Sequence, residues 1–199
     1  VSFAVAEHIS GTTWQDFGDI MNERAKELGC VDSHFVNPNG LPNEDHYTSA
    51  YDLAMIGKAF FANEALCKMT MTHMLHILPS ERQPADLMEV NKMELIPGGK
   101  YAYPYLVGCK TGYTDVARST LVSCAEKDGM KLICVVMRDE NPNYYEDTIS
   151  LFDYGFSNFG KVNIAQTETK YNIENPGSFY SGNDIFGNSK PILELNQSD

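Results

Sequence analysis

The chain has 199 residues and a formal net charge of -12 at pH 7, with 43% hydrophobic and 11% aromatic residues. This composition suffices for one ordinary domain with a sizeable core, or for one domain and the start of another, and it argues against global disorder. An acidic chain repels phosphate backbones, so we expect no nucleic-acid partner. No apolar run approaches the roughly 18 residues that a membrane-spanning helix needs.

The opening residues, VSFAVAEHIS, have the pattern of a helix interior. Val1, Val5 and Ile9 recur on one face, and no capping residue precedes them. The first residue is valine rather than methionine. We therefore expect these residues to continue a longer protein, in which any targeting segment lies upstream.

Two further helices are predicted from their caps. Thr13 and Asp16 form a capping-box pattern ahead of a helical stripe, and Gly29 is a candidate C-cap. Ser49 and Asp52 mark the start of the next helix, and Asp52 is interpreted as a cap. The buried stripe predicted for that helix is Leu53, Ile56, Gly57 and Phe60.

Residues 63–100 are predicted to be mostly loop, with a short helix near 64–69 and short extended pieces, because prolines and glycines interrupt the pattern. The methionines of this stretch are expected to fill gaps in the core. His73 and His76 could share a helical face, but no third ligand is evident, so we expect no metal site.

Strands are predicted over 106–113, 119–125 and 131–137, with Asp128-Gly129 as the turn between the last two, and an amphipathic helix over 145–159. The predicted fold class is α/β of the α+β type, an antiparallel sheet flanked by helices. After Gly160 the composition shifts toward Thr, Asn and Val. We expect residues 1–160 to form the C-terminal part of one domain and 161–199 to start a β-rich appended domain.

The five cysteines are odd in number, and their spacings match no zinc pattern. We expect all five to be free thiols, with Cys124 and Cys134 as small core residues. Cysteine usage alone leaves the cellular compartment open.

The stretch GCKTGYTD carries the candidate site. Lys110-Thr111-Gly112 ends an apolar strand, and Lys-Thr-Gly accompanies Ser-x-x-Lys and Ser-x-Asn in serine β-lactamases and penicillin-binding proteins. In such a site the lysine holds positive charge near the nucleophile, and the threonine hydroxyl binds the substrate carboxylate. The glycine admits the substrate backbone, and the backbone just beyond it, at Tyr113, can supply an oxyanion donor. Alone, the tripeptide also fits an ordinary strand end.

A longer resemblance supports the catalytic interpretation. KTGYTDVARSTLVSCAEKDGMKLICVVM resembles the Lys-Thr-Gly strand and hairpin of the low-molecular-mass penicillin-binding proteins, the serine D-alanyl-D-alanine carboxypeptidases of peptidase family S11. Residues 4–60 are similar to the segment that follows Ser-x-Asn in that family. Residues 144–159 resemble the last helix of its catalytic domain, and 161–171 resemble the entry into its β-rich second domain.

The resemblance implies a β-lactamase/transpeptidase-like fold and a hydrolase that trims terminal D-Ala from peptidoglycan stem peptides through a serine acyl-enzyme. It implies Lys110 as a catalytic residue and Thr111, Gly112 and Tyr113 as substrate-binding residues, without metal or cofactor. The implied ligands are peptides ending in D-Ala-D-Ala and β-lactam antibiotics. The implied location is extracytoplasmic, in the bacterial cell envelope, with membrane anchoring only through segments that this chain does not show.

The chain also departs from the family pattern. No lysine has a serine three residues before it, and Ser181-Gly182-Asn183 follows Lys-Thr-Gly instead of preceding it. We expect the true elements to lie upstream of Val1, and the 199-residue chain alone to be inactive. Relatives often carry a basic residue just before a glutamate, where this chain has Tyr145. Arg118 and Arg138 are nearby in sequence, each as a candidate cation or as a plain surface residue.

Two alternatives remain open at this stage. One is a serine β-lactamase, against which the β-rich tail argues. The other is a non-catalytic homologue that binds peptidoglycan.

Overall fold

The computed structural model describes residues 1–161. The predicted β-rich domain at 161–199 lies almost wholly outside the described residues and stays a prediction. Val1–Phe159 form one compact unit. No helix within the described part of the chain has the length and apolarity to cross a membrane. The elements are α1 (Ser2–Ser10), α2 (Asp16–Glu27), α3 (Ala50–Phe61), α4 (Glu64–Met71), β1 (Met74–Ile77), β2 (Leu87–Val90), β3 (Leu106–Thr114), β4 (Arg118–Lys127), β5 (Met130–Asp139) and α5 (Asn143–Asn158).

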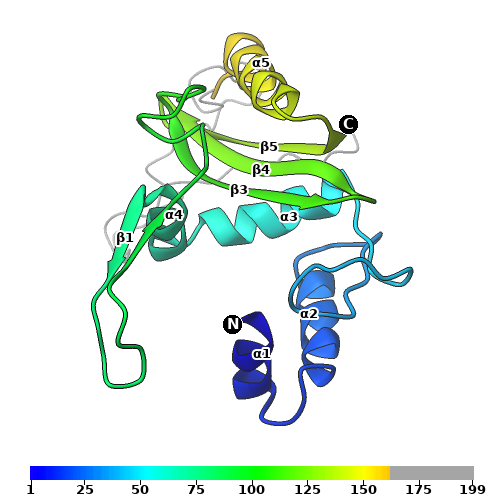
Figure 1. The fold of residues 1–199 in the computed structure, drawn as a ribbon. Helices are drawn as coiled ribbons and strands as arrows, with labels where there is room; N and C mark the ends of the chain where they lie inside the picture. The colour runs from blue at the N-terminus through cyan, green and yellow to red at the C-terminus, as the bar shows by residue number, and fades with distance from the viewer. Residues whose placement is uncertain (162–199) are drawn as a thin grey trace, which may run out of the picture. The chain divides into compact units, whose positions relative to one another are not determined.

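A three-stranded antiparallel sheet of order β3-β4-β5 is the frame of this unit (Figure 1). The strands, the turn at Asp128-Gly129 and the closing helix lie within a few residues of their predicted positions, so these predictions are confirmed. In the β3–β4 pair, Lys110 lies opposite Val122 and Thr111 lies opposite Leu121. Opposed residues share a face of the sheet, and neighbours along a strand alternate between faces.

The two faces of the sheet are covered by different helices (Figure 1). On the α5 face, Leu121, Ala125 and Phe152 belong to the main core. On the α3 and α4 face, a smaller core joins Phe61, Cys67 and Cys124. Gly108 permits this second contact, since a Cβ on it would lie 2.9 Å from the Phe61 ring.

The stretch between α3 and β3 contains the short helix and the short extended pieces that its sequence predicts. β1 and β2 pair as an antiparallel hairpin, and all residues of both strands are exposed. The irregular segment that follows contributes the fully buried Leu95 and Ile96 to the main core. The methionine prediction is wrong for Met69 and Met74, whose exposed fractions are 69% and 52%.

The two histidines of this stretch do not share a helical face. His73 precedes β1 and His76 lies within it, so neither residue is on a helix. His76 Nε2 lies 2.5 Å from Asp86 Oδ1 across the exposed hairpin. His76 and Asp86 are therefore hydrogen-bonded to each other on the surface.

Thr13 and Asp16 exchange hydrogen bonds at the start of α2, although the cap residue of that helix is Gln15. Ser49 caps α3 as predicted, but Asp52 does more than cap. Its backbone N–H donates to Ser49 Oγ at 3.2 Å, as the cap prediction requires. Its fully buried carboxylate accepts from the N–H groups of Val31 and Asp32 at 3.1 and 2.7 Å, and from Ser33 Oγ at 2.6 Å. Asp52 thus ties the loop after α2 to the first turn of α3.

The hydrogen bonds to Asp52 predict a pH-dependent contribution to stability. Burial raises the pKa of this carboxyl, but the bonds from Ser33, Val31 and Asp32 outweigh it and hold the pKa below its ordinary 3.8. A depressed folded pKa means that the contribution is complete above the unfolded pKa of about 3.9 and is lost as pH falls through the folded value. In Asp52→Asn an amide N–H₂ would replace one of the two accepting oxygens.

We expect Asp52→Asn to lower the melting temperature at pH 7 by on the order of 5 °C, and the gap to the wild type to narrow as the pH falls below about 4. Thermal unfolding followed by circular dichroism measures both. Asp32→Asn is the matched control, because its side chain is exposed. An Asp52→Asn gap that does not change with pH would contradict this account.

All five cysteines are buried free thiols. Burial raises the pKa of Cys109 to about 12, and those of Cys124 and Cys134 to about 11. The thiolate is the reactive form of cysteine. Cys109 is therefore an inert core residue even though Lys110 follows it.

We expect these three thiols to resist iodoacetamide at pH 8 in the folded protein and to react fully in guanidinium chloride. Peptide mass spectrometry reads out each cysteine separately. Rapid alkylation of Cys109 under native conditions would contradict its assignment as an inert residue.

Candidate active site

Lys110, Thr111, Gly112 and Tyr113 line a hollow of about 610 Å³ at the end of β3. β3 is an edge strand of the sheet, so one of its sides has no strand partner among residues 1–161. The structure therefore brings the four residues predicted from sequence to one exposed site. The other lining residues are Arg118, Ser119, Glu140, Asn141 and Tyr144.

Because side chains alternate along β3, Lys110 and Thr111 lie on opposite faces of the sheet. Lys110 shares a face with Val122, on the side of α3 and α4, and Thr111 shares the opposite face with Leu121. Both also line a second, largely apolar hollow of about 390 Å³ beside α4. The Lys110 ammonium is exposed and donates to the carbonyl of Thr111.

Gly112 has an internal reason to be glycine. A Cβ on it would lie 2.7 Å from Thr120 Oγ1, which itself donates to the Gly112 carbonyl at 3.1 Å. The sheet's own packing thus restricts this position, in addition to any approach of a substrate backbone. Beyond it, the Tyr113 hydroxyl donates to Asp115 Oδ1 at 3.3 Å.

Sequence reasoning missed the residues that support β3 from the side. Asn91 donates from Nδ2 to the carbonyls of Thr70 and Thr72 at 2.9 and 3.1 Å, which fixes the hairpin to the end of α4. Thr70 Oγ1 in turn accepts from the N–H of Cys109 at 3.4 Å. These residues are single polar positions in an irregular stretch, so no periodicity marks them.

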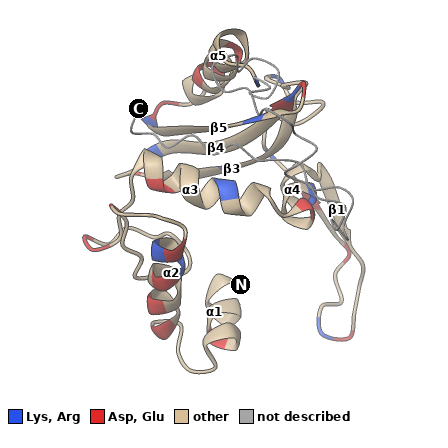
Figure 2. Cartoon of the chain, turned by 180° about the vertical axis from the view of Figure 1, so that it is seen from behind, with Lys and Arg blue, Asp and Glu red and all other residues tan. Residues whose placement is uncertain are grey.

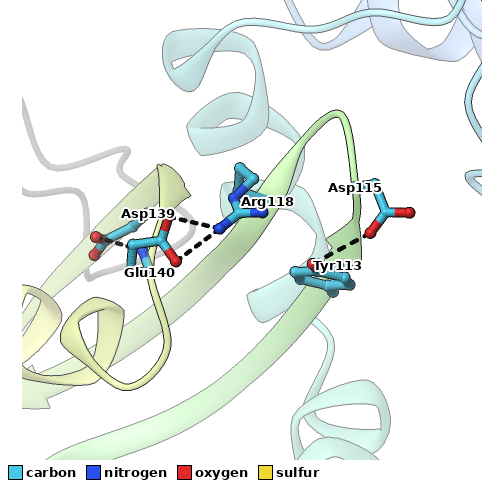
Figure 3. A network of polar contacts seen from close by, with 5 residues as sticks. All are labelled: Tyr113, Asp115, Arg118, Asp139 and Glu140. Atoms are coloured by element: carbon cyan, nitrogen blue, oxygen red, sulfur yellow. Dashed lines mark hydrogen bonds and ion pairs between the residues drawn. The ribbon is translucent and has the colours of Figure 1, made fainter.

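The structure separates the two candidate arginines. Arg118 lines the hollow, and its guanidinium bonds Glu140 at 2.7 and 2.8 Å (Figure 3). Arg138 is exposed and is not among the lining residues. On α5, Tyr145 is buried in the core with its ring stacked on Tyr101. The α5 residue that lines the hollow is Tyr144.

The site's chemistry is that of anion binding. Among the lining residues, Lys110 and Arg118 are cations and Glu140 is a carboxylate. The Thr111 hydroxyl adds a hydrogen-bonding group to the same lining. Within the described part of the chain, no three His, Cys, Asp or Glu side chains are grouped so as to hold a metal ion. The hollow can therefore bind a carboxylate and place positive charge beside a reacting group.

Comparison with known proteins agrees with this architecture. Residues 1–141 match the peptidase S11 family, described as D-alanyl-D-alanine carboxypeptidase. The chain is 35% identical over 159 residues to the D-alanyl-D-alanine carboxypeptidase DacF of Bacillus subtilis. The aligned residues make up 79% of this chain and 39% of DacF. The chain thus spans about two fifths of the length of this curated relative.

Solved structures show the same fold. A D-alanyl-D-alanine carboxypeptidase from Mycobacterium tuberculosis superposes with a TM-score of 0.68 at 30% identity, covering 80% of this chain and 60% of that one. A Streptomyces DD-transpeptidase superposes with a TM-score of 0.64 at 24% identity, and the match covers 71% of this chain and 54% of the transpeptidase. At this identity the match shows the fold alone. The predicted transpeptidase-like fold class is confirmed. The chain belongs to the peptidase S11 family of D-alanyl-D-alanine carboxypeptidases.

Proposed function

We propose that this chain forms the substrate-binding wall of a D-alanyl-D-alanine carboxypeptidase that removes the terminal D-Ala of peptidoglycan stem peptides. The observation that carries the proposal is the placement of Lys110, Thr111 and Gly112 on an exposed edge strand that borders a cationic hollow. Membership of the family supports this reaction over the β-lactamase alternative.

The roles of the residues follow from their positions. The Lys110 ammonium stabilises negative charge where a serine nucleophile attacks the substrate carbonyl, and the Thr111 hydroxyl donates to the substrate's carboxylate. The Tyr113 N–H is the oxyanion donor on this wall. The acyl-enzyme requires a serine from a Ser-x-x-Lys element, which is not among these 199 residues.

The proposed partners follow from the same chemistry. Peptides ending in D-Ala-D-Ala are the substrates, and β-lactams are the inhibitors that acylate the same serine. Because these substrates are cell-wall peptides, we place the activity outside the cytoplasmic membrane of a bacterium. No cofactor enters the proposed reaction.

A chimera tests this wall directly. The segment of Bacillus subtilis DacF that matches this chain is replaced by the corresponding residues of this chain, so that DacF supplies the rest of the site. We expect the chimera to release D-Ala from a diacetyl-Lys-D-Ala-D-Ala peptide. Lys110→Ala should reduce kcat/KM by about 100-fold because it removes charge at the reacting centre, and Thr111→Val by about 10-fold because it removes one hydrogen bond to a charged group.

Lys58→Ala is the matched control for the chimera, since Lys58 is exposed on α3 and lines neither hollow. A folded chimera without carboxypeptidase activity would favour the alternative of a non-catalytic peptidoglycan-binding homologue. An active chimera that tolerates Lys110→Ala would remove Lys110 from the mechanism.

The 199-residue chain alone is expected to form no covalent adduct with a fluorescent penicillin, because it lacks the Ser-x-x-Lys nucleophile. Gel fluorescence after denaturation measures this, with the active chimera as the positive control. A labelled band from the chain alone would show that another residue serves as nucleophile.

A further inference from the structure

The candidate site holds one more cation than the Lys-Thr-Gly motif supplies. Arg118, the first residue of β4, lies opposite Thr114 and lines the same hollow as Lys110 and Thr111. The residue that α5 contributes to this hollow is Tyr144, which carries no charge at neutral pH. Arg118 is therefore the second positive group that an anion would meet there.

The ion pair with Glu140 holds Arg118 without using all of its donors. Both hydrogen bonds come from one nitrogen, Nη2, which contacts Oε1 and Oε2 of Glu140 at 2.7 and 2.8 Å. Glu140 is itself anchored, because its N–H donates to Asp139 Oδ1 at 2.7 Å. In Figure 3 the guanidinium lies between Glu140 and Tyr113. A guanidinium has five N–H donors, so the N–H groups of Nη1 and Nε, which lie on different edges, remain for single hydrogen bonds to a carboxylate.

The backbone at Arg118 has an unfavourable conformation that a substitution can relieve. Its φ is 57°, in the left-handed region that glycine adopts freely and that costs free energy for other residues. The ion pair does little to offset this cost, since 41% of the arginine side chain and 64% of the glutamate side chain are exposed. The strain does not by itself assign a role, because Arg138 has a similar φ of 56° and does not line the hollow.

The charge around the hollow favours an anionic ligand only because of these two cations. The chain carries a net charge of -12, and acidic side chains recur along α2 (Figure 2). Among the residues that line the hollow, the cations are Lys110 and Arg118 and the anion is Glu140. Loss of Arg118 would leave the lining without net positive charge.

We infer that Arg118 is a specificity-determining residue that binds the terminal carboxylate of the peptide substrate, with Glu140 as the positioning residue that keeps its guanidinium in the hollow. The inference rests on the proposed function, because it assigns a group to the substrate of that same site. In this role Arg118 distinguishes peptides with a free C-terminal carboxylate from peptides that end in a neutral group.

The test compares two probes that differ only in that charge. The ¹⁵N-labelled 199-residue chain is titrated with millimolar N-acetyl-D-Ala-D-Ala and, separately, with its C-terminal amide, and the amide resonances of residues 110–113 and the Arg118 Nε–H report binding. We expect the wild type to bind the acid more tightly. Arg118→Gly should reduce the ratio of the two affinities by about 10-fold, the effect of one hydrogen-bonded charge.

Arg138→Gly is the matched control, because Arg138 also has a left-handed φ, of 56°, and does not line the hollow. Both glycine variants should melt at or above the wild-type temperature, since glycine relieves the backbone, so a loss of selectivity in only one of them cannot come from unfolding.

The outcomes are distinct. A ratio that falls in Arg118→Gly and not in Arg138→Gly supports the inference. A wild type that prefers the acid, with Arg118→Gly unchanged, overturns the role of Arg118 and leaves the proposed function standing. A wild type that binds neither probe, or binds both equally, overturns the inference, whereas the proposed function is decided separately by the activity of the DacF chimera, which supplies the rest of the site.

Discussion

Antiparallel pairing between β3 and β4 decides which side of the sheet each residue of Lys-Thr-Gly reaches. With Lys110 opposite Val122 and Thr111 opposite Leu121, the ammonium and the hydroxyl lie on different faces of one exposed edge. A shift of the register by one residue would exchange them and would place a lysine over the α5 core. The buried residues of β4, which alternate between the two cores, oppose that shift.

The same register explains why the neighbouring elements are placed as they are. Gly108 lies on the face that receives Phe61 at the end of α3, so this helix can approach the strand closely. Asp52, at the start of α3, fixes the other end of that helix to the preceding loop. A helix that packs on β4 and β5 and reaches β3 through Phe61 is therefore held at both of its ends.

Most of this framework is readable in the sequence, because strong local signals repeat there. The strand pattern, the Asp-Gly turn, the Thr13 and Ser49 caps and the Lys-Thr-Gly motif each need only a few adjacent residues. Contacts between residues that are far apart in the sequence cannot be predicted from such local signals. Arg118 and Glu140 are 22 residues apart in sequence and meet only through the strand pairing, and the choice between Tyr144 and Tyr145 depends on the phase of a helix.

Burial in the stretch before β3 is hard to predict for a related reason. Leu95 and Ile96 are fully buried but stand in an irregular segment, where burial leaves no period of two or 3.6 residues. The β1–β2 hairpin is exposed on both faces, so its strands lack the alternation of apolar and polar residues that identifies a half-buried strand. The sequence therefore predicts core positions for methionines such as Met69 and Met74, which face solvent in the structure.

That hairpin has a consequence for the protein's behaviour at high concentration. It presents an apolar surface on a short two-stranded sheet whose edges are unpaired within the described residues, which is a feature that promotes contact between molecules. The net charge of -12 opposes such contact by mutual repulsion. Colloidal stability should therefore decline in high salt and near the isoelectric point of about 4.7, where repulsion is weakest. The apolar residues concerned are Met74, Leu75, Ile77, Leu87, Met88 and Val90.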